Sequence, residues 1–310
     1  MAGNKNAGEK RTRSLRIMNM HIPYHIVMII WSFISIFPLF FLVINTFKVK
    51  KEIYINFFGL PQKWTLENYT SLMSNSDFFG YFRNSFLVVV VSLSMILLVG
   101  SLCAYALAHW RTKTSKVVYY FFIIGMMLPI KIATIRLLQI MKALNTLNTL
   151  FCLFPVYIAM GLPTAIFILT EFIHGLPREL YEAGYMDGAS RFKIWYRIVI
   201  PLIRPALATV AIYNLVPIWN DLWFPLIFIT KESSKTVLLA VTRLQGQYTT
   251  DWPKLLTVLT LSSLPVTCPG TGRSQAGKTA SAPSAASASR SYIVPAGASP
   301  QAEPSWRIPW

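Results

Sequence analysis

Asn220 and Asp221 are the residues with the clearest chemical potential, because they interrupt a long apolar run at residues 205–229. A carboxylate that faces lipid costs several kcal/mol, so Asp221 is expected to face other helices or a wet cavity. There it could accept hydrogen bonds from the hydroxyl groups of a bound solute, or form a structural bond to a neighbouring helix. Both roles stay open. The candidate residues for a solute pathway in this run are Asn214, Trp219, Asn220 and Asp221.

Other residue patterns resemble catalytic or metal sites, but the residues around them do not support such a site. His21 and His25 are four residues apart, but Pro23 lies between them and no third ligand is near. Residues 272–279 match the phosphate-loop pattern of NTPases, yet no strand precedes them and no acidic motif follows. The three cysteines show neither a disulfide framework nor a metal-ligand spacing. We therefore expect no catalytic, metal or cofactor site in this chain.

The composition that surrounds these residues indicates a membrane protein. Of the 310 residues, 54% are hydrophobic and 13% are charged, against about 45–50% and about 25% in soluble domains. So few charges cannot cover a water-facing surface of this size, which excludes a disordered chain and most soluble enzymes. The net charge of +17 fits cations in loops beside anionic lipid. Nucleic-acid binding is not expected, because no basic patch with interleaved aromatic residues lies outside the apolar runs.

The apolar runs predict an all-α fold, a polytopic transmembrane helical bundle with five full spans plus a truncated sixth. About 20 apolar residues cross about 30 Å of hydrocarbon, and five runs reach that length, at residues 22–47, 85–110, 117–138, 149–170 and 205–229. The basic residues before the first run and the basic turn at 111–116 place the N-terminus in the cytoplasm, although the outer loops also carry cations. The first run is too long for a secretory signal and no cleavage site follows it.

The sixth apolar run begins at Leu255 and stops at Val266. About 12 residues do not span a bilayer. The chain then becomes rich in Ser, Ala, Gly and Pro without helical or strand periodicity, which predicts disorder. The expected organisation is a basic cytoplasmic N-terminus at 1–21, a transmembrane domain at 22–266 and a low-complexity disordered tail at 267–310.

Residues 172–204, between the fourth and fifth runs, form the longest predicted cytoplasmic loop. Pro177 suits the first turn of a short helix that ends near Met186. Gly188 then breaks the helix, and Ser190 can cap a second helix that ends near Pro201, because proline lacks a backbone donor. On physical grounds alone, this helix–turn–helix unit could equally be an ordinary interfacial loop.

The order of residues in this loop is specific. Glu182, Ala183 and Gly184 are followed by three residues, then Gly188, nine residues and the run 198–201. This order resembles the signature of ATP-binding-cassette (ABC) importer permeases, which is Glu-Ala-Ala, three residues, Gly, nine residues, Ile, one residue, Leu-Pro. Two conservative departures occur, at the second Ala and at the Leu. The loop positions that carry the match or flank it are Glu182, Ala183, Gly184, Asp187, Gly188, Ala189, Ile198 and Pro201.

The resemblance extends over about residues 23–266 and is strongest to the carbohydrate branch of that family, related to the inner-membrane subunits of maltose-type importers. Segments that carry it outside the loop are Asn84–Ser85, Leu128–Pro129, Leu144–Thr146, Trp219–Asp221 and Gln245–Trp252. It implies a membrane-spanning permease subunit of an ATP-driven carbohydrate importer in the bacterial cytoplasmic membrane. The implied partners are a second homologous permease, a cytoplasmic ABC ATPase dimer, an extracytoplasmic sugar-binding protein and the lipid bilayer.

The resemblance also implies roles for the loop residues. The first short helix would dock in a groove of the ATPase, the subunit that binds ATP and Mg²⁺, and this chain would bind no cofactor itself. Glu182 could pair with an arginine of the ATPase. Small side chains at Ala183, Gly184 and Gly188 would let the partner surface approach closely. The chain is therefore not expected to be an enzyme.

An ion-coupled secondary transporter of small polar solutes is the alternative. That class carries coupling charges inside its spans and shows internal repeats. Here only Asp221 qualifies as such a charge, and no repeat is visible. An intramembrane enzyme is a third class, but the runs contain no paired His, Ser/Lys or Asp/Asp set.

We predict that a reading-frame change or a sequencing error after Val266 produces the tail. Resequencing the gene should reveal another frame that encodes about 10 further apolar residues to complete the span. The expressed tail should be protease-sensitive and the transporter weak or inactive. The alternative is a genuine extension with a re-entrant final segment, since a half-span needs burial in protein. Resequencing that confirms the present reading frame, together with full transport activity, would reject the prediction.

Overall fold

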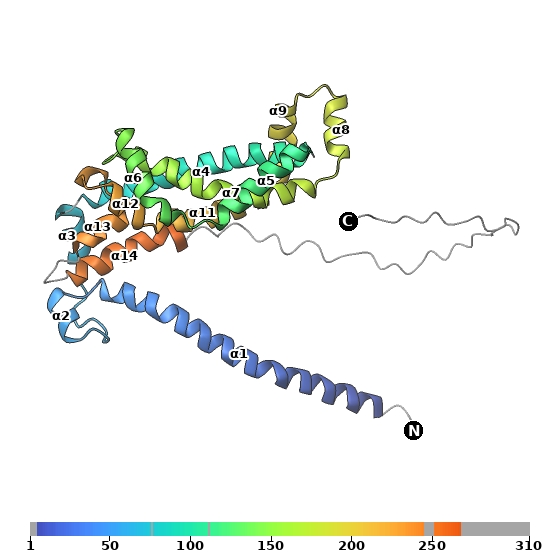
Figure 1. Cartoon of the computed structure of the whole chain (residues 1–310). Helices are drawn as coiled ribbons and strands as arrows, with labels where there is room; N and C mark the ends of the chain where they lie inside the picture. The colour runs from blue at the N-terminus through green and yellow to red at the C-terminus, as the bar shows by residue number, and fades with distance from the viewer. Residues whose placement is uncertain (1–4, 76, 111, 245–250, 268–310) are drawn as a thin grey trace, which may run out of the picture. The chain divides into compact units, whose positions relative to one another are not determined.

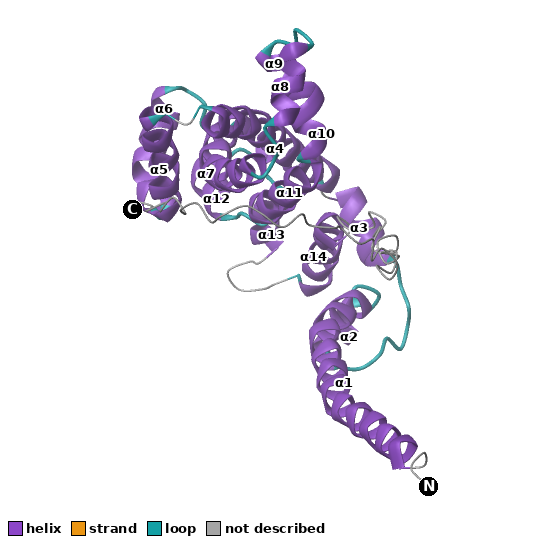
Figure 2. Ribbon diagram, turned by 90° about the vertical axis from the view of Figure 1, so that its right-hand side faces the viewer, coloured by secondary structure: helices purple, strands orange, loops and turns teal. Residues whose placement is uncertain are grey.

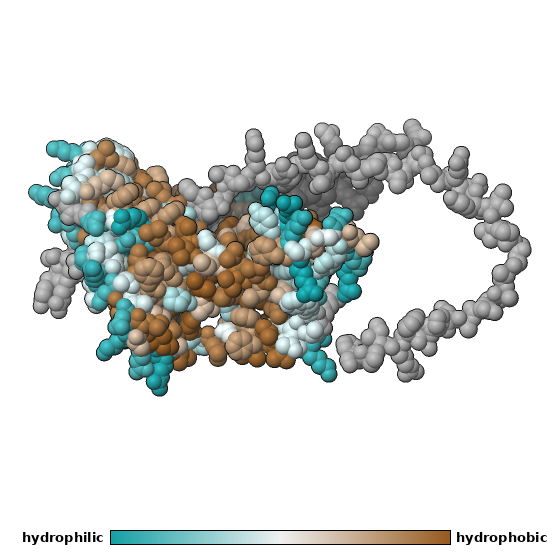
Figure 3. All heavy atoms as spheres, turned by 90° about the horizontal axis from the view of Figure 1, so that it is seen from above, coloured by the Kyte–Doolittle hydropathy of each residue, from teal (hydrophilic) through white to brown (hydrophobic). Residues whose placement is uncertain are grey.

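The computed structural model of the chain describes residues 5–75, 77–110, 112–244 and 251–267. Every regular element in these ranges is a helix (Figures 1 and 2). The all-α class predicted from the apolar runs is thus confirmed for the described residues. A broad band of apolar residues lies between hydrophilic ends in the space-filling view (Figure 3).

Three helices are long and apolar enough to cross a membrane. They are α1 (Lys5–Asn45), whose apolar part is Tyr24–Asn45, α4 (Phe78–His109), and α7 (Leu153–His174) with the short turn η2 (Leu150–Cys152) before it. These helices correspond to the first, second and fourth apolar runs, and confirm them.

The third apolar run is not one straight helix. Helix α5 (Lys113–Met127) ends at Leu128, and the chain continues as η1 (Ile130–Ala133) and α6 (Thr134–Ala143). The two parts are bent by 82°. Pro129 causes the break, because proline lacks a donor and forces the preceding residue out of the helical region. The continuous helix expected over residues 117–138 was therefore wrong.

The fifth apolar run is also interrupted. Helix α11 (Arg204–Trp219) has 16 residues, about 24 Å at about 1.5 Å per residue, and α12 (Trp223–Phe228) follows after a gap. The fifth full span predicted over 205–229 therefore consists of two helices with a break between them. The described residues contain three spans, or up to five if each of two bent helix pairs counts as one. The second such pair joins residues 191–202 to α11 at an angle of 77°.

The partial sixth run forms α14 (Trp252–Thr267), which is surrounded by protein. Its Leu255 and Val258 are buried, and it contacts α1, α2 (Lys50–Ile55), α3 (Glu67–Asn75) and α13 (Val237–Leu244). The Nε1 of Trp219 on α11 donates to the carbonyl of Ser262 at 2.8 Å. A short segment is tolerated at membrane depth when protein buries it. Residues 268–310 lie outside the described residues.

Helices α4 and α7 pack along each other and form the centre of the bundle. Small residues allow the close approach, since a Cβ built on Gly100 would lie 2.9 Å from the Cβ of Ala165. Buried Ile96, Ala104 and Leu169 fill the rest of this contact. Small residues at helix contacts are the usual basis of packing inside membranes, where lipid supplies no hydrophobic drive.

Two asparagines fix the segment between α12 and α13. The Nδ2 of Asn84 on α4 donates to the carbonyls of Ser233 (2.8 Å) and Lys235 (3.0 Å). The Oδ1 of Asn148, in the turn before α7, accepts from the backbone N–H of Thr230 at 2.7 Å. Asn148 has φ +64°, a left-handed conformation that asparagine tolerates better than most residues. This segment, which includes the short 3-10 helix η4 (Glu232–Ser234), is thereby tied to α4 and to the turn before α7.

We predict that Asn84→Ala destabilises this end of the bundle. The change leaves the carbonyls of Ser233 and Lys235 without their donor, and the loss at the buried Lys235 carbonyl should cost about 1–3 kcal/mol. Thermal unfolding in detergent measures the loss, and limited proteolysis between residues 230 and 237 locates it. Ser94→Ala, at an exposed position of the same helix, is the control and should leave both measurements unchanged. Equal stability of the two variants would contradict the assigned clamp.

Candidate functional site

The loop at residues 175–204 forms a helical hairpin at one end of the bundle, away from α2, α3 and α13 (Figure 1). Its first helix, α8, spans Glu179–Met186, within one residue of the predicted bounds. The second is α9 (Arg191–Ile194), which continues through a π-helical turn, η3 (Trp195–Val199), into α10 (Ile200–Leu202). Two helices around a glycine turn were predicted, and the π-helical turn was not.

The turn between the two helices uses the residues that the sequence assigned to it. Gly188 has φ +69°, a conformation that glycine adopts without steric cost. The Oγ of Ser190 accepts from the backbone N–H of Lys193 at 3.3 Å and so caps α9. The turn chemistry is confirmed. It follows that a large residue at Gly188 would strain the turn itself, whatever surface lies outside it.

Gly184 has a different role from the one expected. It is the buried residue of α8, and a Cβ at this position would lie 3.1 Å from side-chain atoms of both Ile194 and Ile198. The glycine therefore lets the two helices of the hairpin pack tightly against each other. The expectation that its small size serves the approach of a partner was wrong, because the chain's own second helix occupies that side.

The remaining signature residues divide into an outer and an inner set. Glu182, Ala183, Asp187, Gly188 and Pro201 are exposed, whereas Ala189 and Ile198 are half-buried. On α8 the exposed residues continue into Met186, which is 88% exposed. Glu182, Ala183 and Met186 are thus among the exposed residues of α8, and we call these three the free face of the hairpin.

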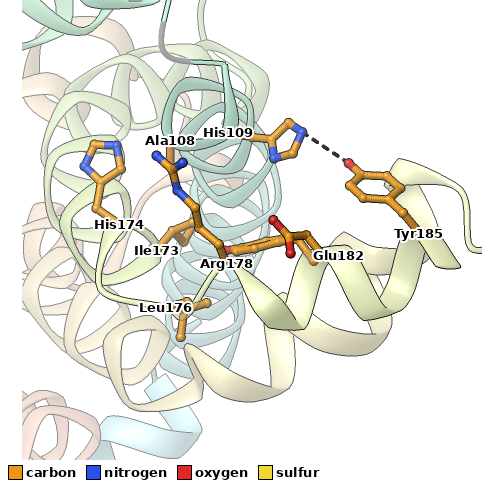
Figure 4. Close-up of a pocket in the computed structure, with 9 residues that line it drawn as sticks. Ala108, His109, Ile173, His174, Leu176, Arg178, Glu182 and Tyr185 are labelled. Carbon is orange, nitrogen blue, oxygen red and sulfur yellow. Dashed lines mark hydrogen bonds between the residues drawn. The ribbon is translucent and has the colours of Figure 1, made fainter.

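An aromatic cluster attaches α8 to the end of α4. The hydroxyl of Tyr185 and the Nε2 of His109 are 3.1 Å apart (Figure 4). The His109 ring also packs against Tyr181 at 6.0 Å and Tyr105 at 5.7 Å between centroids. Burial raises the pKa of the Tyr181 hydroxyl, and Tyr185 adds to the shift. We call these four residues the α4–α8 joint.

Sequence reasoning missed the α4–α8 joint. Tyr105 and His109 are four residues apart, as are Tyr181 and Tyr185, so each pair shares one helix face. That spacing was the available signal, but it does not show that this face of α4 packs against this face of α8. Beside the joint, the guanidinium of the exposed Arg191 lies 5.3 Å from the centroid of the Trp110 ring.

A cavity of about 450 Å³ lies beneath α8, between the ends of α4 and α7 (Figure 4). Its lining includes His109, His174, Arg178, Tyr181 and Glu182. Because the cavity separates α8 from α7, the helix contacts the bundle chiefly through the α4–α8 joint and its own hairpin partner.

A second cavity, of about 520 Å³, lies between α5, α7 and α11. Both helix breaks reach it, through Leu128 and Lys131 on one side and Asn220 and Asp221 on the other. Asn214 also lines it. Non-helical backbone at membrane depth is tolerated where it lines a cavity or is buried in protein. The structure thus gathers three of the four predicted pathway residues around one space.

Asp221 makes structural bonds at the edge of this cavity. Its Oδ2 accepts from the Tyr157 hydroxyl at 2.8 Å and from the N–H of Phe224 at 3.2 Å. Its Oδ1 accepts from the N–H of Trp223 at 3.3 Å. The carboxylate therefore caps α12 and ties it to α7, which is the structural alternative foreseen for this residue.

Trp219, the fourth predicted pathway residue, is buried, contacts α14 through Ser262 and does not line the cavity. Lys131 lines the cavity with its Nζ 5.7 Å from the centroid of the Trp223 ring.

Residues 96–268 match the family model described as "Binding-protein-dependent transport system inner membrane component". The chain belongs to this family. It is accordingly a multi-pass permease of an inner-membrane transport system, as the signature in the α8–α9 hairpin indicated.

Curated relatives match most of the chain. A putative ABC transporter permease protein of Caldicellulosiruptor sp. (strain Rt8B.4) is 34% identical, over 78% of this chain and 88% of the relative. The diacetylchitobiose uptake system permease protein of Streptomyces coelicolor is 32% identical, over 78% and 81%. A probable starch degradation products transport system permease protein of Thermoanaerobacterium thermosulfurigenes is 32% identical, over 77% and 86%.

Solved structures agree on the fold. A chain of a bacterial ABC transporter involved in the import of the acidic polysaccharide alginate superposes with a TM-score of 0.70 at 19% identity, over 82% of this chain and 94% of that chain. A chain of the alginate transporter in complex with a pentasaccharide-bound periplasmic protein gives 0.62 at 16% identity, over 84% and 93%. The helix arrangement described above is therefore the permease fold.

We predict that Asp221→Asn keeps most of the stability of the permease, whereas Asp221→Ala does not. The amide retains one oxygen for the N–H groups of α12 and a donor for Tyr157. Alanine leaves these groups unpaired, at about 1–3 kcal/mol for each buried group. Thermal unfolding in detergent compares the two, with Tyr157→Phe as the control that removes one bond only. An Asn variant as unstable as the Ala variant would show that the charge itself is required.

Proposed function

We propose that this permease is the membrane-spanning subunit of an ATP-driven carbohydrate importer. It forms the translocation pathway with a second, homologous permease and transmits the motion of a cytoplasmic ATPase dimer through the loop at 182–201. An extracytoplasmic sugar-binding protein delivers the substrate. ATP and Mg²⁺ bind to the ATPase, and the N-terminus of this chain lies in the cytoplasm.

The carbohydrate substrate is supported by the named relatives. Permeases for diacetylchitobiose, for starch degradation products and for multiple sugars are each 30–32% identical to this chain. One structural neighbour comes from a complex with a periplasmic protein that carries a pentasaccharide, which supports a binding-protein partner. Uptake of a panel of labelled sugars by the assembled importer tests the substrate class.

The free face of the hairpin is the observation that carries the coupling role. Ala183 has a small side chain that allows close approach, Met186 offers a flexible apolar contact, and Glu182 offers a carboxylate to a partner arginine. The opposite side of α8 is occupied by Ile194 and Ile198. A partner that binds the exposed residues of α8 leaves this contact intact, and a displacement of α8 would pass to α4 through the α4–α8 joint.

The pathway role rests on the cavity at the two helix breaks. Asp221 has its bonds satisfied within the chain. The Asn220 amide is exposed there and makes no side-chain hydrogen bond to the described residues. Amide groups and a lysine cation suit the hydroxyl groups of a sugar. We therefore assign solute contact to Asn220 and Lys131, and a supporting role to Asp221.

We predict that Ala183→Trp abolishes retention of the ATPase when the importer is purified in detergent. The indole would occupy the free face of α8, while φ/ψ at an ordinary helical position stays unstrained. Ala183 suits this test better than Gly188, where a large residue would strain the turn. Co-purification of the ATPase measures the effect, and membrane insertion should be unchanged.

Thr114→Trp is the control for this prediction. Thr114 is exposed and lies in α5, near the same end of the bundle but outside the hairpin. The ATPase should remain bound to this variant. Normal retention with Ala183→Trp would reject the assigned docking face, and sugar uptake driven by sodium or protons without an ATPase would reject the proposed function altogether.

A further inference from the structure

A small folded unit follows the end of α1 and is organised around a buried lysine. Lys48 is fully buried, and its Nζ donates to the carbonyls of Asn56 and Phe57, both at 3.0 Å. Burial lowers the pKa of this ammonium, and the nearby Glu52 carboxylate opposes the shift. The Nδ2 of Asn68 donates to the carbonyl of Lys48 at 2.8 Å. We call residues 46–68 the α2 cap.

The α2 cap is built directly on the last turns of the first span. The rings of Phe57 and Phe58 lie 5.1 Å and 5.2 Å from the Phe41 ring of α1. The apolar part of α1 has 22 residues, about 33 Å at about 1.5 Å per residue, which matches about 30 Å of hydrocarbon. The cap therefore begins where the hydrocarbon ends.

The surface of the α2 cap is unusually apolar for a segment outside the spans. Ile55, Phe58, Leu60 and Trp64 are 74%, 79%, 69% and 67% exposed. So many exposed apolar side chains in one short segment are uncommon on a surface that faces only water. The packing of Lys48, Glu52 and Asn68 inside the cap fixes the backbone that holds these side chains outward.

The exposed charges of the α2 cap are mostly basic. Lys50, Lys51 and Lys63 are exposed, Glu52 is buried, and Glu67, near the end of the cap, is its exposed acidic residue. The Oε1 of Glu52 accepts from the backbone N–H of Gln62 at 2.5 Å. The surface offered to a partner is thus apolar and aromatic with lysines at its margin.

We propose that the exposed face of the α2 cap lies in the headgroup layer of the membrane and binds anionic lipid. Aromatic and apolar side chains enter the boundary between headgroups and acyl chains, and lysines beside them reach the phosphates. The position at the end of a span favours lipid over a protein partner, because this depth is where the headgroups lie. The inference depends on the first span and is independent of what the permease transports.

Fluorescence quenching by brominated lipids tests the proposal. In a chain whose cysteines at 103, 152 and 268 are replaced by alanine, Phe58→Cys carries a bimane label. The full chain is reconstituted into vesicles of phosphatidylethanolamine and phosphatidylglycerol with bromine near the headgroup. We expect strong quenching at position 58. The same label at Asp187→Cys, on the tip of the α8–α9 hairpin, is the control and should not be quenched.

A second labelling position and the intact importer make the outcome decisive. Leu60→Cys replaces Phe58→Cys if loss of the phenyl ring impairs folding, and it should also be quenched. The measurement is repeated in the complete importer, with and without its binding protein. Quenching that persists supports lipid contact. A label that is unquenched in the bare vesicles, or shielded by another subunit or by the binding protein, would overturn the proposal in favour of a protein partner.

Charge substitution tests the preference for anionic lipid. The triple variant Lys50→Gln, Lys51→Gln, Lys63→Gln should lose the stronger quenching by brominated phosphatidylglycerol over brominated phosphatidylcholine. Quenching by the neutral lipid should persist, because the apolar side chains remain. Identical preference in the variant and the parent chain would reject the assigned role of the lysines.

Discussion

A backbone group that leaves a helix inside hydrocarbon must find a protein partner, and this requirement determines where the chain places its polar side chains. At the second break, Asp221 supplies acceptors to the first N–H groups of α12. Lipid cannot provide these bonds. After α12, Asn148 and Asn84 bind the outer segment that leads to α13. A few polar residues therefore permit the interruptions on which the cavity and the outer segment depend.

A few residues likewise determine the shape of the α8–α9 hairpin. Gly184 brings its two helices into contact, and Gly188 reverses the chain in a conformation that other residues rarely adopt. The two halves of the hairpin meet the bundle differently. Helix α8 does so through aromatic rings, and the second half does so through Ile194 and Val199, which are buried in the apolar core. A displacement of α8 would therefore reach the bundle through both contacts.

The sequence alone was sufficient to predict the features that depend on residues close together along the chain. The three uninterrupted spans, the bounds of α8, the turn at Gly188 and the cap at Ser190 follow from apolar length, glycine and capping chemistry. Counting apolar residues did not locate the helix breaks near Pro129 and Asp221. The residues around each break remain largely apolar, so the apolar run continues through it. The roles of Gly184 and Trp219 depend on which helix lies opposite, and spacing alone carries no such information.

The bonding of Asp221 also constrains how this cavity could discriminate among solutes. A carboxylate that already accepts from a tyrosine and two backbone groups has little capacity left for a ligand. Its position is set by α12, so any movement of α12 relative to α7 must break the bond to Tyr157. Asn220 and Lys131 lie on different breaks, one on each side of the cavity. A solute that contacted both would therefore respond to the distance between the breaks, and this distance changes only when the two bent helices move relative to each other.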